Sequence, residues 1–345
     1  MVRLLLLALC LLGAVQLAPC SAMYEVDRVA EYDRRYPREW PPKDYIPNNE
    51  GWRSVHEHRF KQIREMDNHG EKYEGWMQSV FAAFLVQNFT EYGFGLVRAP
   101  EELTQALQEG IRGGLERGEA RLEYQVDVIE GPRCLFIDRP DLTKRVLTEL
   151  QTYTEAWAQM ELTPHIAYGF RLYQNNSVLN MHVDKKQTHI VSMIFHIDSS
   201  DDAEDWPIYI EDLLGRTHEV VLKPGDILFY ESSKCLHGRP KMFNGSWYSS
   251  IFIHYYPTHG WQQTDHQQRA HYIVPPGWND KVEEKKETPL KMIGTSFKEP
   301  TCPNGWCATQ DTVKWSGPGE EGVWIDPMMV RHPFEPKRFS AGDEL

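Results

Sequence analysis

Two segments ahead of residue 160 carry apolar residues at every third or fourth position, the pattern of a helix with one buried face. Pro100 marks the expected start of the first helix, and Asp141 is the expected cap of the second. The apolar stripes consist of Leu103, Leu107, Ile111 and Leu115 in the first helix and Leu142, Val146, Leu150 and Trp157 in the second. Residues 77–86 are a third candidate. We expect these helices to pack against a sheet.

The pattern changes near residue 164, where short apolar runs replace the helical stripes. From His165 to Tyr256, segments rich in Val, Ile, Phe and Tyr alternate with turn-forming residues, which indicates strands. The predicted strands are Ile166–Tyr173, His189–Ile197, Trp206–Ile210, Glu219–Leu222, Asp226–Tyr230 and Trp247–Tyr255. The predicted turns are Asn175-Asn176-Ser177, Lys223-Pro224-Gly225 and Asn244-Gly245. Because no helical pattern interrupts these runs, we predict an antiparallel sandwich or barrel.

The ends of the chain carry targeting patterns. Arg3 precedes an apolar run from Leu4 to Val15, and small residues at positions 20–22 close the segment, as in a cleaved signal peptide. The run is shorter than the roughly 20 residues that a membrane-spanning helix needs. The last four residues, Gly-Asp-Glu-Leu, are similar to the retention tetrapeptide Lys-Asp-Glu-Leu except at the first position. We therefore expect a secretory-pathway protein without a membrane span after signal removal, in the endoplasmic reticulum lumen in preference to secretion.

Cysteines and sequons are compatible with that route. Cys302 and Cys307 flank the turn-forming residues Pro-Asn-Gly-Trp and could close a short disulfide. Cys134 and Cys235 lie far apart in the sequence, and we interpret them as buried free thiols. Three sequons that fit a glycoprotein begin at Asn88, Asn175 and Asn244.

Composition narrows the classes of function. The 345 residues include 50 acidic and 37 basic side chains, for a formal net charge of -13. Nucleic-acid binders need clustered Lys and Arg to replace the counterions of the phosphate backbone. We therefore expect no nucleic-acid partner, although a small basic pocket inside an acidic protein is compatible with this balance.

A pair of potential metal ligands lies in the strand-rich region. His182 and Asp184 are two residues apart, so in a strand both can reach one point inside the sheet structure. His237 follows after several further strands. Two imidazoles and one carboxylate on one face of a metal leave the opposite face open, which suits a non-haem Fe(II) oxygenase. Alone the pair is weak evidence among 14 histidines, and a core role for His182 or a turn role for His237 is the alternative.

Several motifs in this order resemble those of the prolyl 4-hydroxylase-like 2-oxoglutarate/Fe(II)-dependent oxygenases. The matching pieces are Tyr173, His182-Val-Asp184, Pro224-Gly225-Asp226 with Leu228-Phe229-Tyr230, and His237-Gly238-Arg239-Pro240. The resemblance implies an α+β fold in which a double-stranded β-helix (jelly-roll) barrel carries a supporting helical layer. Together with the targeting patterns and composition, it divides the chain into a signal peptide (1–22), an N-terminal arm and helical layer (23–160), the oxygenase jelly-roll (161–258) and an irregular C-terminal extension (259–345).

The resemblance also implies the cofactors. Fe(II) would be bound by His182, Asp184 and His237, with 2-oxoglutarate as co-substrate, O₂ as oxidant and ascorbate as an optional reductant. The family usually places a lysine about ten residues after the distal histidine to pair with the 5-carboxylate of 2-oxoglutarate. This chain has Gly245-Ser246-Trp247-Tyr248 there, and Leu179 stands where the family has a tyrosine.

A buried carboxylate needs another partner when that lysine is missing. The candidate cations are Arg171 and Arg239, ahead of Lys185 and Lys186. Tyr173 and Tyr248 are candidate hydroxyl donors, with core packing as the alternative. His189 and His196 lie on the strand after the metal motif, where one could face the pocket.

These observations predict a dioxygenase that hydroxylates a protein side chain and releases succinate and CO₂. Peptidyl proline is the leading substrate, with a protein or peptide as partner, and the oligomeric state is left open. The same chemistry on another residue or a small molecule is the first alternative. A non-catalytic binding module on the same barrel, favoured by the missing lysine, is the second, and a cupin-like metal protein is the third.

Overall fold

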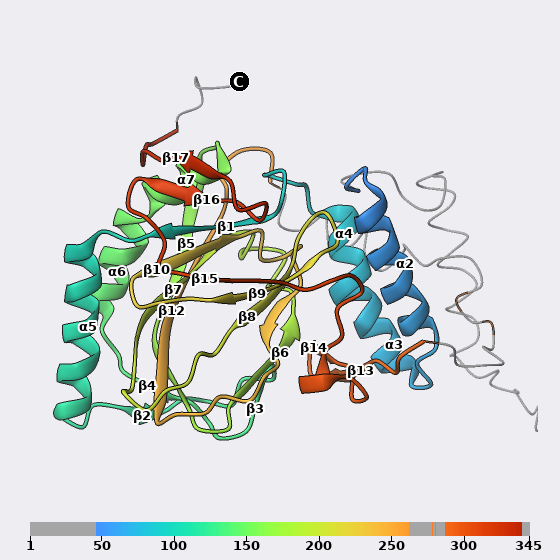
Figure 1. Cartoon of the computed structure of the whole chain (residues 1–345), viewed down its shortest axis with the longest axis horizontal. Coiled ribbons are helices and arrows are strands. Elements are labelled where there is room, and N and C mark those ends of the chain that lie inside the picture. Colours follow the sequence, from blue (N-terminus) through green and yellow to red (C-terminus); the bar gives the residue numbers. More distant parts are fainter. Residues whose placement is uncertain (1–45, 262–277, 279, 281–286, 340–345) are drawn as a thin grey trace, which may run out of the picture.

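The computed structural model describes residues 46–261, 278, 280 and 287–339. The expected signal peptide, most of the N-terminal arm and the last six residues lie outside this part. In Figure 1 the strands occupy the middle of the molecule, with one group of helices at each side. None of the helices in the described ranges is long and apolar enough to cross a membrane.

The helices are α2 (Glu50–Arg64), α3 (His69–Gly75), the π-helical turn η1 (Trp76–Val80), α4 (Phe81–Leu85), α5 (Glu101–Glu116), α6 (Pro140–Glu149), α7 (Gln151–Ala158) and the 3₁₀ turn η2 (Pro303–Gly305). The strands are β1 (Phe94–Arg98), β2 (Arg121–Leu122), β3 (Ile129–Glu130), β4 (Leu135–Phe136), β5 (Leu162–Gln174), β6 (Val178–His182), β7 (Val191–Ser199), β8 (Ile208–Glu211), β9 (Thr217–Val221), β10 (Asp226–Tyr230), β11 (His237–Arg239), β12 (Trp247–Pro257), β13 (Lys291–Ile293), β14 (Ser296–Lys298), β15 (Val313–Ser316), β16 (Val323–Ile325) and β17 (Arg331–Pro333).

Two large sheets form the centre of the protein. Within the described residues, one sheet has nine strands in the order β17-β16-β1-β10-β7-β12-β5-β4-β2. The other has eight, in the order β13-β14-β6-β11-β8-β9-β15, with β3 beside β6. Apolar side chains of both sheets share one core cluster, which includes Leu96, Ile194 and Leu228 from the first and Ile210 and Val220 from the second. This mixed α+β arrangement is consistent with the jelly-roll that the sequence resemblance implies.

Helices α5, α6 and α7 cover the outer face of the nine-stranded sheet, as the apolar stripes predicted. Leu107, Ile111 and Val146 are fully buried against strands β5, β7, β10 and β12. The second predicted helix is in fact two, because α6 ends at Glu149 and α7 begins at Gln151. Asp141 lies inside the first turn of α6 rather than at its cap, which is Arg139.

The eight-stranded sheet packs against the other group of helices. Met181 and Val183 next to the end of β6 share a core cluster with Ile63 of α2 and Trp76 of η1. Only part of the predicted helix at residues 77–86 is α-helical, because η1 precedes the short α4. The outer face of the metal-motif strand is therefore supported by helices.

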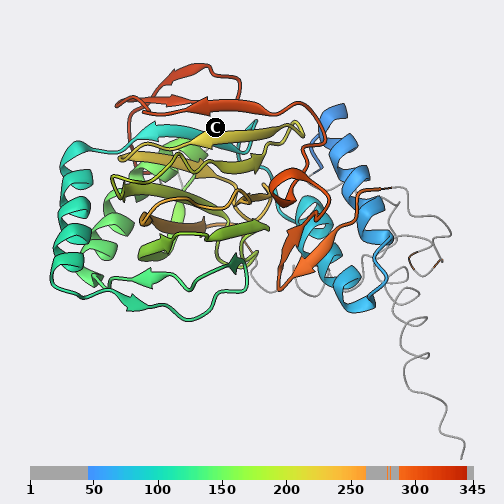
Figure 2. The same cartoon turned by 60° about the horizontal axis from the view of Figure 1, so that its bottom comes forward.

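The C-terminal extension differs from the irregular tail that the sequence predicted. It contributes strands β13 to β17, which join both sheets: β14 pairs with β6, β15 with β9 and β16 with β1. Figure 2 shows these segments lying along the sheets. Their apolar periodicity is hard to recognise because each strand has only three or four residues.

The predicted cysteine chemistry agrees with the structure. Cys302 and Cys307 form a disulfide, and Cys134 and Cys235 are buried free thiols. The disulfide loop lies beside a buried ion-pair network. Glu299, just ahead of it, accepts hydrogen bonds from the Arg59 guanidinium of α2 and from the backbone amide of Cys307.

Candidate metal centre and cavity

Two neighbouring strands bring the predicted metal ligands together. His182 ends β6 and His237 begins β11, and these two residues are direct antiparallel partners in the register. Asp184 follows β6, where its backbone amide donates to the carbonyl of Ser232 at 2.8 Å. Strand β11 thus fixes the chain at His182, and the loop between β10 and β11 fixes it at Asp184.

The three side chains are close enough to share one ion. Oδ1 of Asp184 lies 3.6 Å from Nε2 of His182 and 3.8 Å from Nε2 of His237. A metal ion binds such donors at about 2.0–2.2 Å, so two donors of one ion lie at most about 4.4 Å apart. All three ligand atoms lie within 4.8 Å of one another. The donor set therefore fits a divalent metal of the iron type.

Both imidazoles are oriented with Nε2 toward the centre. Nδ1 of His182 lies 2.8 Å from the carbonyl oxygen of Asn180, and Nδ1 of His237 lies 2.9 Å from that of Cys235. Because a carbonyl only accepts, each Nδ1 carries the proton and each Nε2 presents a lone pair. Burial lowers the pKa of His237 to about 4, which keeps it neutral at physiological pH.

Two further side chains surround the second oxygen of Asp184. The Tyr230 hydroxyl donates to Oδ2 at 3.2 Å, and Nδ1 of His254 lies 3.9 Å from Oδ2. Burial alone would raise the pKa of Asp184, but its hydrogen bond with His182 and the nearby imidazoles outweigh burial and lower the pKa. The carboxylate is therefore ionised and held with Oδ1 toward the two histidines.

A cavity of about 460 Å³ opens onto the three ligands. Its size falls in the range of about 300–1,000 Å³ that is typical of small-molecule sites. The lining residues are Val126, Val128, His165, Ile166, Tyr168, Arg171, Tyr173, Leu179, His182, Val183, Asp184, Lys185, His189, Ile194, Tyr230, His237, Phe252, His254 and Thr295. The cavity therefore leaves room for ligands beside the open face of the triad.

The structure separates the two candidate arginines. Arg171 lines the cavity, but its guanidinium is paired with the carboxylate of Glu123 through bonds of 2.8 and 2.6 Å. The Tyr168 hydroxyl donates to the same carboxylate at 2.5 Å. Because Glu123 neutralises the charge, Arg171 has little net charge to offer an anionic ligand.

Arg239, in contrast, lies outside the cavity lining and has no carboxylate partner among the described residues. It is 2% exposed, and it donates to the carbonyl of Trp206 and, at 3.1 Å, to the hydroxyl of Tyr248. Within the described ranges no carboxylate pairs with it. Its guanidinium also stacks over the rings of Trp206 and Tyr248, at 5.0 and 4.7 Å. Arg239 and Tyr248 are not part of the cavity lining, and Tyr173 lies in the same aromatic cluster as Trp206 and Tyr248.

Tyr173 connects the cavity with this cluster. It lines the cavity, its ring packs edge-on against Trp206 at 4.9 Å, and Arg171 lies 5.9 Å from its ring centre. Its buried hydroxyl has no hydrogen-bond partner among the residues that the structure describes. Burial raises its pKa to about 12, so the hydroxyl stays protonated and available as a donor.

Of the two further histidines that the sequence analysis named, one lines the cavity and the other does not. His189 lines the cavity and stacks on His254 at 3.9 Å, while His196 stacks on Tyr248 at 4.0 Å away from the lining. Sequence reasoning missed His254, although Tyr248 and His254 have the same parity along one predicted strand and should face the same side. Tyr230 was matched only as part of a motif, and no signal in the sequence points to Glu123.

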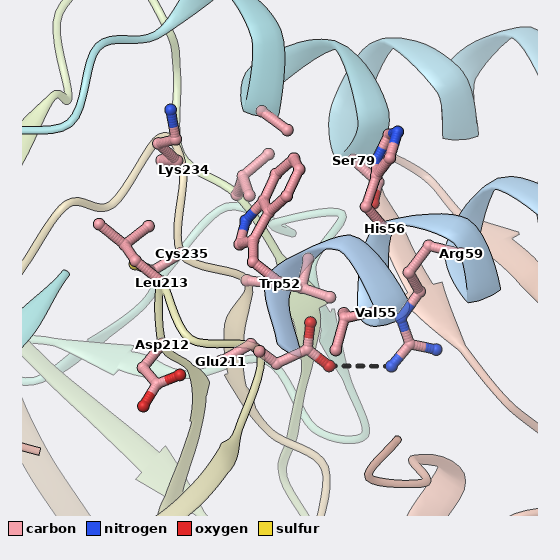
Figure 3. Close-up of a pocket in the computed structure, with 14 residues that line it drawn as sticks. Trp52, Val55, His56, Arg59, Ser79, Glu211, Asp212, Leu213, Lys234 and Cys235 are labelled. Atoms are coloured by element: carbon pink, nitrogen blue, oxygen red, sulfur yellow. Dashed lines mark hydrogen bonds and ion pairs between the residues drawn. The ribbon is translucent and has the colours of Figure 1, made fainter. Parts of the chain in front are cut away.

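A second cavity, of about 50 Å³, lies behind the metal strands. Val183, Cys235 and Leu236, which adjoin the ligands in sequence, form part of its wall. Figure 3 shows the dashed ion pair between Arg59 of α2 and Glu211 of β8, whose length is 2.9 Å. This small cavity lies between α2 and the sheet that holds His237.

Comparisons with known proteins give neighbours in structure only. No protein-family model matches the chain, and no curated protein matches it in sequence. A prolyl 4-hydroxylase from Pseudomonas putida is 18% identical, with a TM-score of 0.38, over 48% of this chain and 93% of that one. HygX from Streptomyces hygroscopicus, solved with nickel, 2-oxoglutarate and hygromycin B, is 12% identical, with a TM-score of 0.37, over 49% and 84%.

A third neighbour is a prolyl hydroxylase from Trichoplax adhaerens in complex with a fragment of hypoxia inducible factor. It is 8% identical, with a TM-score of 0.38, and the match covers 66% of this chain and 99% of that one. HygX has also been solved with iron bound. The neighbours in structure are thus a prolyl 4-hydroxylase and other 2-oxoglutarate- or iron-binding oxygenases.

Proposed function

We propose that this protein is a 2-oxoglutarate- and Fe(II)-dependent dioxygenase that hydroxylates a protein side chain. The observation that carries the proposal is the triad of His182, Asp184 and His237, whose donor atoms converge on one point at a cavity. Two imidazoles and one carboxylate are the donor set of non-haem Fe(II) oxygenases, and they leave one face of the metal for co-substrate and O₂. The ordered sequence motifs around the triad support the same class.

The residues of the chain have separable tasks in this proposal. His182, Asp184 and His237 would hold Fe(II), which with 2-oxoglutarate and O₂ supplies the oxidising power for hydroxylation, with succinate and CO₂ as co-products. The carbonyls of Asn180 and Cys235 set the tautomers of the two imidazoles. The Tyr230 hydroxyl holds the carboxylate in place, as supporting hydrogen bonds do in other metal sites.

The far carboxylate of 2-oxoglutarate needs a cation, and we assign this role to Arg239. It is buried and lacks an anionic partner among the described residues, whereas Glu123 neutralises Arg171. The unbonded Tyr173 hydroxyl between the cavity and the Arg239 cluster would supply a second donor. For the ligand to reach Arg239, a side chain of the Tyr173 cluster must shift.

The substrate and the compartment are part of the proposal. Peptidyl proline is the leading substrate because of the sequence resemblance, and another side chain or a small molecule is the alternative. The apolar run at residues 4–15 and the final Gly-Asp-Glu-Leu support action in the secretory pathway. Hydroxylation of secreted proteins would fit that route.

The test compares the wild type with His182→Ala and, as matched control, His259→Ala, whose imidazole is exposed and contacts Glu161. We expect wild type and control to bind one Fe(II) and to release succinate from 2-oxoglutarate with ascorbate present. His182→Ala should lose at least 100-fold in metal affinity and all turnover. Metal binding without succinate release under any substrate mixture would instead favour the binding module.

A further inference from the structure

Among the residues that the structure describes, the mouth of the cavity carries a positive charge that no carboxylate pairs with. Lys185 lines the cavity, is exposed, and makes no ion pair in the part of the chain that the structure describes. Its carbonyl accepts the backbone amides of Thr188 and His189 at 3.2 and 2.9 Å, which fixes the turn that carries it. The backbone of Lys185 is therefore fixed directly after the metal motif, and its side chain extends from that position.

No carboxylate among the lining residues is available to balance this charge. Asp184 is committed to the triad, and Glu123 is paired with Arg171 behind the wall. Asp127 alternates with the lining residues Val126 and Val128, and it lies close to Gly294 instead. The cavity mouth thus has the opposite sign to a protein whose net charge is -13.

The neutral part of the wall is aromatic and aliphatic. His165, His189 and His254 follow one another from the mouth toward Asp184, with ring centres 5.3 and 3.9 Å apart. Burial lowers the pKa of His165 and His189, and the charge of Lys185 adds to the effect, so both imidazoles are neutral at physiological pH. Lys185 therefore supplies the charge at the mouth.

The mouth continues onto the outer surface. Ile166 of β5 is 39% exposed while it also lines the cavity, and Val126, Val128 and Thr295 approach from two other segments. A peptide that passes its reacting side chain into the cavity would lie across these apolar residues on its way in and out. A small molecule confined to the cavity would not use the exposed side of Ile166 or Lys185.

We propose that the substrate is an acidic peptide, with an Asp or Glu beside the oxidised residue that pairs with Lys185 and apolar residues that pack on Ile166 and Val126. This inference deepens the proposed function and rests on it for the position of the oxidised residue. Charge complementarity of this kind contributes more to selection and association rate than to total affinity. The acidic surface elsewhere would repel such a peptide, so the mouth is its favourable docking place.

The test measures binding of six fluorescein-labelled eleven-residue peptides to the full-length protein by fluorescence anisotropy. The central residue is proline or asparagine, and in each case it is flanked by two Asp, two Ser or two Lys. We expect the acidic peptides to bind at least fivefold more tightly than the basic ones at low salt. The difference should shrink at 0.5 M salt, where screening is stronger.

Two charge reversals make the test specific. Lys185→Glu should abolish or invert the preference for acidic over basic peptides. Lys144→Glu, on the exposed face of α6, changes the net charge by the same amount and should leave this preference intact. Equal binding of all peptides, no binding of any, or equal effects of the two variants would overturn the inference. So would tighter binding of a small aromatic carboxylate than of every peptide.

The same samples separate this inference from the proposed function. If the wild type never releases succinate but Lys185→Glu still inverts the preference, the oxygenase assignment fails and the acidic-peptide surface stands. If the wild type turns over 2-oxoglutarate but Lys185→Glu leaves peptide preference unchanged, the oxygenase stands and the acidic-peptide inference fails. Each failure therefore has its own signature.

Discussion

At the scale of single residues, the candidate site depends on a few backbone contacts. Two carbonyls choose the tautomers of His182 and His237, and one tyrosine hydroxyl holds Asp184. None of these partners is a metal ligand, yet each restricts where a ligand atom can point. The site is thus oriented by the strands rather than by the ligands alone.

The two arginines allow a residue-scale prediction. Arg239→Leu should raise the KM for 2-oxoglutarate at least tenfold without changing Fe(II) affinity, because it removes a buried cation that has no carboxylate partner within the described residues. Arg239→Lys keeps the charge, so its KM for 2-oxoglutarate should lie between those of the wild type and Arg239→Leu. The measurement is succinate release against 2-oxoglutarate concentration.

Arg171 provides the counter-experiment. The double variant Arg171→Leu/Glu123→Leu, which removes both partners of the pair so that no buried carboxylate is left uncompensated, should leave this KM within about twofold of the wild type. If this double variant raises the KM while Arg239→Leu does not, the anchor is Arg171 and Glu123 must exchange partners on binding. Metal affinity by calorimetry, measured on each variant, excludes a general collapse of the site.

At the scale of elements, helix α2 is tied to the sheet by buried charges. The Arg59 guanidinium pairs with Glu211 of β8 at 2.9 Å and with Glu299, ahead of the disulfide loop, at 3.0 Å. The neighbouring residue Ile210 of β8 is the register partner of His237. Removing one partner of such a buried network leaves an uncompensated charge, which costs several kcal/mol.

Glu299 makes this network sensitive to acid. Burial alone would raise its pKa, but hydrogen bonding with His58 and the charge of Arg59 outweigh burial and lower the pKa to about 2. The ordinary value is 4.5, so ionised Glu299 stabilises the folded state fully above pH 4.5. This contribution, about 3 kcal/mol, is lost as the pH falls from 4.5 toward 2.

We therefore expect Glu299→Gln to lower the free energy of unfolding by about 3 kcal/mol at pH 7. The variant should also lose less stability than the wild type between pH 4.5 and pH 3. Urea unfolding followed by circular dichroism measures both effects. Glu320→Gln, which removes an exposed pair with Arg331, is the matched control and should change stability by less than about 1 kcal/mol. If the free energy of unfolding of wild type and Glu299→Gln falls in parallel with pH, Glu299 is not the source of the acid sensitivity.

At the scale of the whole molecule, segments far from the motif complete both sheets. Strand β1 pairs with β10, and the C-terminal strands β14 and β15 pair with β6 and β9. Leu290, Phe297 and Trp306 of the extension also belong to the apolar cluster that supports the metal strand. The predicted jelly-roll segment, 161–258, therefore lacks parts of its own sheets and core.

A fragment of residues 161–258 should consequently fail to fold on its own. We expect no cooperative thermal transition by far-ultraviolet circular dichroism and no protection from hydrogen exchange. The chain from residue 46 to 345 is the control and should unfold cooperatively. A cooperative transition of the fragment alone would contradict the whole-molecule argument and support the shorter boundaries.

The sequence by itself determined those features that repeat along the chain or lie close together in it. Apolar spacing located α5, because burial of one face imposes a period on a helix. Runs of Val, Ile, Phe and Tyr between turn-forming residues located the six predicted strands. The His182–Asp184 spacing, together with the motifs around it, predicted the candidate metal pair, and the short spacer predicted the Cys302–Cys307 disulfide. The break between α6 and α7 was not predicted because the apolar stripe continues across it.

Only the tertiary structure decided which distant segments meet. Glu123 neutralises Arg171 across 48 residues, and Tyr230 reaches Asp184 across 46. The C-terminal strands join β6, β9 and β1 although they are too short to show a period. Pairing between remote segments depends on the complete packing of the chain, and local spacing carries no record of it. For this reason the candidate triad could be predicted from the residues, while the charge of its cavity could not.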